Sequence, residues 1–275
     1  MDPQNYGITS CAGRGRSHNE DACRADLRLG LFIVADGMGG HAGGEKASSL
    51  AADFIVKEVR AGRELSTAVA RAHHAVKQAA ARGMGPQGMG TTVVAMQVLD
   101  HICEISWVGD CRAYLWDGIE LRQLTRDHSY VQHLVDTGVI SPDESDKHPY
   151  QDILIQALGA DDMDDVAVDE LLEELCRNEQ ILLCSDGLIK ELDETAVMDV
   201  LALEWTAQEK VDALVQAALE KGGKDDITAV LVSAARNAPT RSTGEDTVAF
   251  LTQNLIPPGL IDKMRHWWRR VFKRS

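Results

Sequence analysis

Four aspartates each lie at one end of an apolar, strand-like run. Three follow their runs and the fourth precedes its run: Asp36, Asp110, Asp186 and Asp225. If neighbouring strands run antiparallel, these carboxylates gather at one edge of a sheet. Carboxylates that gather without a countercharge repel one another, and a divalent cation relieves that repulsion. A site of carboxylates, a backbone carbonyl and water suits Mg²⁺ or Mn²⁺ and suits zinc poorly.

Hydrolysis of a phosphate ester is the chemistry that such a site permits. If Asp36 bridges two ions about 3.5 to 4 Å apart, a water between them becomes a hydroxide near neutral pH and attacks phosphorus in line. Gly37 lets its own carbonyl turn toward one ion. Arg16 is suited to holding a phosphate in a bidentate fork. The residue types therefore predict a metal-dependent hydrolytic site.

The elements that must position these residues follow from the hydrophobic pattern. Helices are predicted at 45–60, 65–82, 127–138, 194–203 and 207–221. Strands are predicted at 29–35, 91–98, 102–108, 112–116, 119–124, 180–185 and 227–234. Residues 102–116 are predicted to form a hairpin that turns at Gly109 and Asp110. The polar region 141–152 has turn chemistry and is predicted to form a mobile flap beside the site.

Composition and charge limit the classes of partner and compartment. The 275 residues are 44% hydrophobic and 26% charged, which indicates one globular domain with an appendage. The net charge of −15 argues against nucleic acid as a substrate, because phosphate backbones are bound by clustered Lys and Arg. The six cysteines form no C-x-x-C pair and are predicted to be free thiols of a reducing cytosol. With no signal peptide and no membrane-spanning run, the sequence predicts a cytoplasmic protein.

Seven short motifs resemble those of a known family, the metal-dependent Ser/Thr protein phosphatases of type 2C in their bacterial form. They occur in family order across nearly all of residues 7–234 and are Arg16-x-x-Asn19-Glu20-Asp21, Asp36-Gly37-Met38-Gly39-Gly40-His41, Met89-Gly90-Thr91-Thr92, Val108-Gly109-Asp110-Cys111-Arg112-Ala113-Tyr114, Leu124-Thr125-x-Asp127-His128-Ser129, Ser185-Asp186-Gly187-Leu188 and Gly222-Gly223-Lys224-Asp225-Asp226-Ile227-Thr228. The resemblance implies an α+β fold: an αββα four-layer sandwich of two central antiparallel sheets flanked by helices, with the metals at one end.

The resemblance also implies a role for each matching residue at a pair of Mn²⁺ or Mg²⁺ ions. Asp36 would bridge the two ions, and the Gly37 carbonyl would bind the first. Asp186 and Asp225 would bind the second ion. These assignments agree with the chemistry that the strand-end carboxylates suggest by themselves.

The remaining motif residues are implied to act around this pair. Glu20 and Asp21 would act mainly through metal-bound waters, and Arg16 would grip the substrate phosphate. Asp110, together with Asp186, would form the third, weaker metal site described for bacterial members.

One departure from the family pattern concerns the general acid. Met38 stands where many eukaryotic relatives have a histidine proposed to protonate the leaving alkoxide. The sequence therefore leaves the acid unassigned, with His41 and a metal-bound water as candidates.

The resemblance implies a phosphatase that removes phosphate from Ser and Thr in proteins. Its expected partners are phosphorylated proteins and a cognate Ser/Thr kinase whose action it opposes, and the expected state is a monomer. The alternative is a phosphoprotein-binding or scaffold module that keeps the fold without turnover. The complete set of Asp36, Asp186 and Asp225 argues against that alternative, because binding alone needs no bridging water.

The C-terminal part of the chain has a different composition. The predicted organisation is a phosphatase domain at 1–236, a Pro/Thr/Ser-rich linker at 237–258 and a basic amphipathic helix at 259–275. After residue 236 the chain has seven Lys/Arg and three Asp/Glu. Three roles stay open for the helix: adsorption to an anionic membrane at the inner face, docking on a partner protein, and folding back on the acidic body. The sequence favours the first two.

Overall fold

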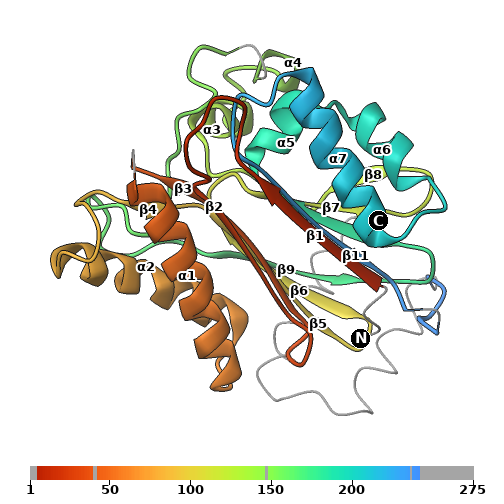
Figure 1. Cartoon of the computed structure of the whole chain (residues 1–275), viewed down its shortest axis with the longest axis horizontal. Helices are drawn as coiled ribbons and strands as arrows, with labels where there is room; N and C mark the ends of the chain where they lie inside the picture. Colours follow the sequence, from red (N-terminus) through yellow and green to blue (C-terminus); the bar gives the residue numbers. More distant parts are fainter. Residues whose placement is uncertain (1–4, 40–41, 146–147, 236, 242–275) are drawn as a thin grey trace.

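The computed structural model describes residues 5–39, 42–145, 148–235 and 237–241 (Figure 1). The predicted C-terminal helix, most of the predicted linker and His41 lie outside the described residues. Within the described ranges, every helix is too short or too polar to cross a membrane.

Two antiparallel sheets form the centre of the molecule (Figure 1). The first sheet has the order β1 (Tyr6–Cys11), β11 (Ile227–Ser233), β10 (Gln180–Cys184), β7 (Arg112–Trp116) and β8 (Leu121–Gln123). The second has the order β2 (Asp21–Asp26), β3 (Leu31–Met38), β5 (Val93–Leu99), β6 (Ile102–Val108) and β9 (Asp169–Glu174). The short strand β4 (Gly90–Thr91) pairs with the end of β3.

Helices cover the outer face of each sheet (Figure 1). The second sheet is covered by α1 (Ala42–Arg60) and α2 (Leu65–Ala81), and the first by α5 (Asp186–Glu191), α6 (Glu194–Leu201) and α7 (Ala207–Lys221). Two further helices, α3 (Tyr130–Asp136) and α4 (Pro142–Ser145), lie in the connection between β8 and β9. The αββα sandwich that the resemblance implied is confirmed.

The position of β3 in the sandwich explains why apolar and polar residues do not alternate in its sequence. Leu31, Ile33 and Ala35 pack against α1 and α2, whereas Phe32 and Val34 pack between the two sheets. A strand in a middle layer is buried on both faces, so apolar residues occur at successive positions. The uninterrupted run therefore reflects a central strand whose C-terminal end delivers Asp36.

The predicted hairpin at 102–116 is wrong. Strand β6 belongs to the second sheet and β7 to the first, so Gly109 and Asp110 carry the chain from one sheet to the other. The inner faces of both strands are apolar, including Ile105 on β6 and Leu115 on β7, and they contribute to the same core between the sheets. Burial of those faces outweighs the direct pairing that a tight turn would permit.

Candidate metal centre

The ends of strands from both sheets bring the predicted aspartates to one edge of the sandwich. In the second sheet, Asp21 at the start of β2 lies directly opposite Asp36 on β3. In the first sheet, Asp186 follows β10 and Asp225 precedes β11, and these two strands are antiparallel neighbours. Asp110 lies in the crossover between the sheets. The topology thus places all five carboxylates at the same edge.

Asp21 joins the two sheets at this edge. Its Oδ2 accepts hydrogen bonds from the hydroxyls of Ser185, at 2.8 Å, and Thr228, at 2.6 Å. The Thr228 N–H in turn donates to the Ser185 hydroxyl at 3.0 Å. Asp21 is therefore held by Ser185, which precedes Asp186, and by Thr228 on β11, and its other oxygen, Oδ1, has no hydrogen-bond partner among the described residues.

Backbone contacts hold Asp36 and Gly37 in place. The Asp36 carbonyl accepts from the Thr92 N–H and the Thr91 hydroxyl, both at 2.8 Å. The Gly37 N–H donates to the Glu20 carbonyl at 3.1 Å. A Cβ at position 37 would lie 2.2 Å from the carbonyl oxygen of Gly44, in the first turn of α1, and 2.5 Å from that of Glu20. Only glycine fits where β3, the loop before β2 and helix α1 meet this closely.

Burial and mutual repulsion raise the pKa of these carboxyl groups. For Asp36 the main cause is burial, followed by the negative charges of Asp21, Asp186, Asp110 and Asp225, and the pKa lies well above 3.8. Burial likewise raises the pKa of Asp21 to about 7 and of Asp110 to about 8. The negative charges of the other four carboxylates all act on Asp36, because the fold places the five side chains at one edge. A nearby divalent cation would stabilise their ionised forms.

The oxygens at this edge fit a divalent ion that prefers oxygen ligands. Asp21 Oδ1 and Asp186 Oδ1 are buried and have no hydrogen-bond partner among the described residues. Asp225 Oδ1 is 2.6 Å from the guanidinium of Arg16, and Asp186 Oδ2 is 2.6 Å from the ammonium of Lys190. Across the described ranges, no three acidic, cysteine or histidine side chains close around one point. Protein cations therefore pair with two of the candidate ligands in this conformation, and an arriving metal would compete with them.

Arg16 lies at this edge, as predicted, and contacts carboxylates. Its guanidinium pairs with Asp225 and lies 3.3 Å from Asp226 Oδ2. About a third of the Arg16 side chain is exposed, so it also faces the solvent from which a substrate arrives. Glu20 lies on the same loop, and its carboxyl carbon would be 2.9 Å from a Cβ at Gly44.

Asp226 is a site residue whose role the sequence did not reveal. It is 1% exposed and accepts from the N–H groups of Gly13 and Glu20, at 2.9 and 2.7 Å. These bonds fix both ends of the loop that carries Arg16. The only sequence signal was a second aspartate directly after Asp225, within the motif at 222–228.

Replacement of Asp226 by alanine is expected to lower the free energy of unfolding by about 2 to 4 kcal/mol, because two backbone donors and Arg16 lose their acceptor. Asp226→Asn should cost less, since its single side-chain oxygen still serves one donor. Urea denaturation of both variants measures the effect, with the exposed Asp199→Ala as a control expected within about 0.5 kcal/mol of wild type. Equal stability of Asp226→Ala and Asp199→Ala would contradict this role.

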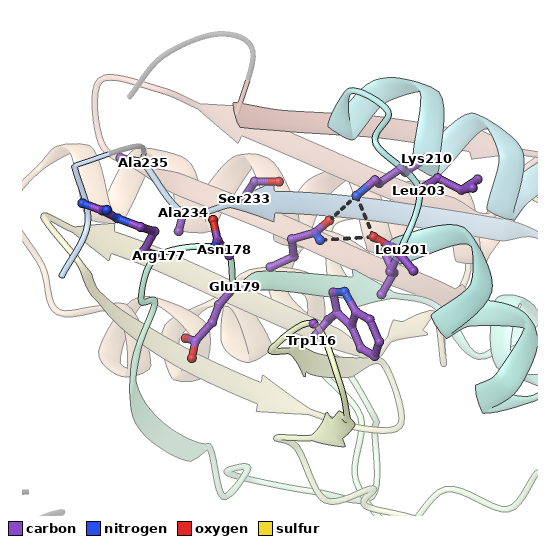
Figure 2. Close-up of a pocket in the computed structure, with 13 residues that line it drawn as sticks. Trp116, Arg177, Asn178, Glu179, Leu201, Leu203, Lys210, Ser233, Ala234 and Ala235 are labelled. Atoms are coloured by element: carbon purple, nitrogen blue, oxygen red, sulfur yellow. Dashed lines mark hydrogen bonds between the residues drawn. The ribbon is translucent and has the colours of Figure 1, made fainter. Parts of the chain in front are cut away.

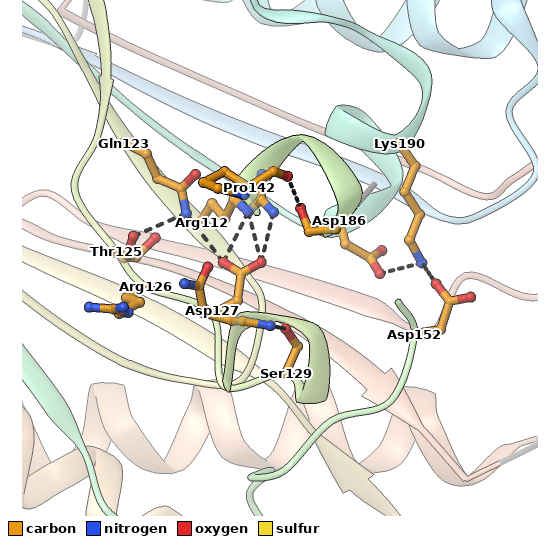
Figure 3. Close-up of polar contacts among 12 residues, drawn as sticks. Arg112, Gln123, Thr125, Arg126, Asp127, Ser129, Pro142, Asp152, Asp186 and Lys190 are labelled. Carbon is orange, nitrogen blue, oxygen red and sulfur yellow. Dashed lines mark hydrogen bonds and ion pairs between the residues drawn. The ribbon is translucent and has the colours of Figure 1, made fainter. Parts of the chain in front are cut away.

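A second polar cluster, of which Figure 3 shows Arg112 and Asp127, fixes the crossover that carries Asp110. The Gly109 N–H donates to His128 Nδ1 at 3.2 Å, and the His128 N–H donates to the Gly109 carbonyl at 2.9 Å. Arg112 Nε and Nη2 donate to both oxygens of Asp127, the shortest contact being 2.7 Å. The motifs at 108–112 and 124–129 therefore brace each other and set the position of Asp110.

Residue 38 offers no proton for the leaving group. Met38 is 39% exposed and ends β3, two residues after Asp36. His41, the other side chain considered as general acid, lies outside the described residues. The assignment of the acid stays open.

The free energy of unfolding of the metal-free protein is expected to fall as the pH rises from about 5.5 to about 8.5. This range contains the raised pKa values of Asp21 and Asp110. The folded-state pKa of Asp21, about 7, and that of Asp110, about 8, lie above the unfolded value of 3.8, so the folded state binds more protons and loses that advantage as they ionise. Thermal unfolding of chelator-treated protein across this range should show a flatter pH dependence for Asp21→Asn than for wild type. The same slope in both proteins would contradict the expectation.

A cavity of about 480 Å³ lies at the opposite end of the first sheet (Figure 2). It is lined by Gln180 and Ser233, which are paired at the ends of β10 and β11 remote from Asp186 and Asp225. The buried Lys210 borders it and donates to the Leu201 carbonyl at 2.7 Å and to Gln180 Oε1 at 3.1 Å. The five residues of β10 separate this cavity from the carboxylates by about 17 Å. The chemistry predicted from the sequence therefore lies elsewhere.

Comparisons with known proteins agree with the fold. The chain matches the family model of protein phosphatase 2C over residues 9–222. It is 38% identical over 233 residues to the serine/threonine phosphatase stp of Listeria monocytogenes, which covers 80% of this chain and 92% of the Listeria protein. The protein belongs to the protein phosphatase 2C family.

Two solved structures show the same architecture. The serine/threonine phosphatase Stp1 from Staphylococcus aureus has a TM-score of 0.76 at 31% identity, over 84% of this chain and 94% of that one. The catalytic domain of the serine/threonine protein phosphatase PstP has a TM-score of 0.71 at 30% identity, over 83% and 96% of the two chains. The PstP structure is a complex with two manganese ions.

Proposed function

We propose that this protein is a Mn²⁺- or Mg²⁺-dependent phosphatase that hydrolyses phosphoserine and phosphothreonine in proteins. The observation that carries the proposal is the convergence of five aspartates from both sheets at one edge, where burial and mutual repulsion raise the pKa of Asp36. Such a cluster is costly for folding alone, because buried like charges destabilise a protein. Family membership and the relatives at 31–38% identity support the same activity.

The residues divide into ligands and supports. Asp36 would contact both ions, because the charges of all four other carboxylates act on it. The Gly37 carbonyl would bind one ion, and Asp186 and Asp225 the other. When bound, the metal pair supplies a water of lowered pKa that serves as the hydroxide for in-line attack on phosphorus.

The protein supplies orientation through the residues around this set. Asp21 and Glu20 would accept from waters between the protein and the ions, and the hydroxyls of Ser185 and Thr228 fix Asp21 in place. Thr91 and Thr92 fix the Asp36 backbone. Arg16 would exchange its carboxylate partners for the substrate phosphate, whose oxygens match its planar fork. Its partly exposed position beside Asp225 supports this exchange.

The substrate class follows from the position of the site. The carboxylates lie at an edge of the sandwich, at the other end of β10 from the cavity beside Lys210. A phosphorylated side chain on a protein surface can reach an edge, whereas a small metabolite is better held by a deep pocket. We therefore infer that phosphorylated proteins are the substrates and that the enzyme opposes a Ser/Thr kinase. The net charge of −15 argues against nucleic acid.

Hydrolysis of a phosphothreonine peptide and of p-nitrophenyl phosphate tests the proposal. We expect release of phosphate from both when Mn²⁺ is present and no release from either in chelator. A protein that binds the phosphopeptide without turnover would instead support the scaffold alternative. Turnover that persists in chelator would contradict the proposed chemistry.

The role of the C-terminal segment and the oligomeric state are proposed from the sequence alone. We propose that the basic helix at 259–275 contacts an anionic membrane or a partner protein, and that the enzyme is a monomer. Co-sedimentation with anionic liposomes, with and without residues 255–275, tests the membrane version, and equal pelleting of the two proteins would remove it.

A further inference from the structure

An ammonium group lies between two carboxylates at the border of the candidate metal centre (Figure 3). Nζ of Lys190 donates to Asp186 Oδ2 at 2.6 Å and to Asp152 Oδ1 at 2.7 Å. Lys190 and Asp186 lie on the short helix α5, four residues apart, which is the spacing at which helical side chains meet. Asp152 lies on the distant segment 148–155. The contact therefore joins a proposed metal ligand to a separate part of the chain.

The charge of this ammonium also acts on the other aspartates of the centre. Burial and then Asp186 raise the pKa of Asp110, and Lys190 opposes that rise. Burial and Asp186 likewise raise the pKa of Asp225, and Arg16 and Lys190 oppose it. Lys190 thus lies among the carboxylates of the first sheet and the crossover, on the side of Asp110 and Asp186.

We propose that Lys190 supplies the third cation of this centre from within the chain, so that the protein binds two divalent ions beside a tethered ammonium. This inference rests on the proposed two-ion site. The carboxylates Asp110 and Asp186 are the pair that the family resemblance assigned to a third, weaker metal. In this chain the Lys190 ammonium already contacts Asp186, and its positive charge acts on Asp110.

Physical chemistry favours the tethered cation over a third metal ion. A lysine ammonium is a compact point charge with three donors, and two of them already meet carboxylate oxygens here. Its stem is anchored four residues from Asp186, so it has a high local concentration that free Mn²⁺ must overcome. A divalent ion that entered beside it would also meet a like charge at close range. Both effects weaken binding of a third ion.

The same contact assigns a positioning role to Lys190. It occupies Oδ2 of Asp186, and Oδ1 is the buried oxygen without a hydrogen-bond partner among the described residues. The ammonium therefore selects the oxygen that Asp186 presents to the metal pair. Through Asp152 it also holds segment 148–155 against α5.

Counting bound manganese tests this inference. Metal-free protein is equilibrated with saturating Mn²⁺ and its metal content is measured, and Mn-soaked crystals locate each ion by anomalous scattering. We expect two ions in wild type and three in Lys190→Met, with the third beside Asp110 and Asp186. The double variant Lys190→Met/Asp110→Asn should return to two. Lys221→Met, which removes a lysine paired with the exposed Asp193, is the matched control and should stay at two.

The possible outcomes separate this inference from the proposed function. A third ion in wild type, with the Lys190 ammonium displaced, overturns the inference even if no variant folds. Two ions in both wild type and Lys190→Met overturn it as well, while the two-ion site survives. Absence of bound manganese from wild type would overturn the proposed function itself.

Discussion

Asp36→Asn is expected to lower kcat for phosphopeptide hydrolysis by more than about 100-fold. Changes to groups that merely orient metal ligands already cost roughly 10- to 100-fold, and Asp36 is proposed to contact both ions directly. The neutral amide is a weaker ligand and cannot bridge two cations as a carboxylate does. Steady-state phosphate release at saturating Mn²⁺ measures the effect.

A matched control separates this loss from a general effect on the fold. Asp53 lies exposed on α1 and pairs with Arg24 on the surface, so Asp53→Asn should keep wild-type turnover. In the absence of metal, Asp36→Asn should be at least as thermally stable as wild type, because it removes a carboxyl whose pKa is raised by burial. An Asp36→Asn enzyme with turnover near that of Asp53→Asn would refute the bridging role.

Removal of the metal is expected to reduce turnover to the rate of the uncatalysed reaction. The Ser185 and Thr228 hydroxyls at this edge are buried and bonded to Asp21, so neither is free to attack phosphorus in place of a metal-activated water. Chelator followed by desalting should leave an inactive, folded protein, and two equivalents of Mn²⁺ should restore activity. Recovery that needs no added divalent ion would show that another group performs the attack.

The location of the site could be predicted from the sequence because strand ends and carboxylates coincide. Asp36, Asp186 and Asp225 each adjoin an apolar run, and antiparallel pairing of β10 with β11 brings the last two together as expected. The family resemblance predicted the αββα sandwich, and the structure confirms it. The roles of these residues toward metal stay a prediction.

Strands with polar sequences could not be found in the same way. Strand β9 reads Asp-Glu-Leu-Leu-Glu-Glu, which resembles a solvated segment, yet Glu173 in it is only 6% exposed. Two ion pairs offset the cost of burying this carboxylate, because Arg122 lies 2.7 Å from Glu173 and Arg241 lies 3.3 Å from it. Arg241 also pairs with the buried Glu179 at 2.7 Å. Only the tertiary fold brings these charges together, so local pattern gives no sign of the strand.

The turn at Gly109 and Asp110 shows a second limit. Two apolar strands joined by a short glycine turn favour a hairpin, and local sequence cannot tell pairing in one sheet from a crossover between two. The crossover is favoured because it buries the inner faces of β6 and β7 in the core between the sheets. That burial depends on the whole sandwich. The function of Asp226 was hidden for a similar reason, because its partners Gly13 and Glu20 lie more than 200 residues away.

The central claim is that aspartates from both sheets hold a pair of divalent ions that share Asp36. Electron paramagnetic resonance of wild-type protein loaded with two equivalents of Mn²⁺ tests it most directly. We expect an exchange-coupled spectrum of two neighbouring ions, with the coupling lost in Asp36→Asn and kept in Asp53→Asn. A spectrum of isolated Mn²⁺ ions in the wild-type protein would contradict it.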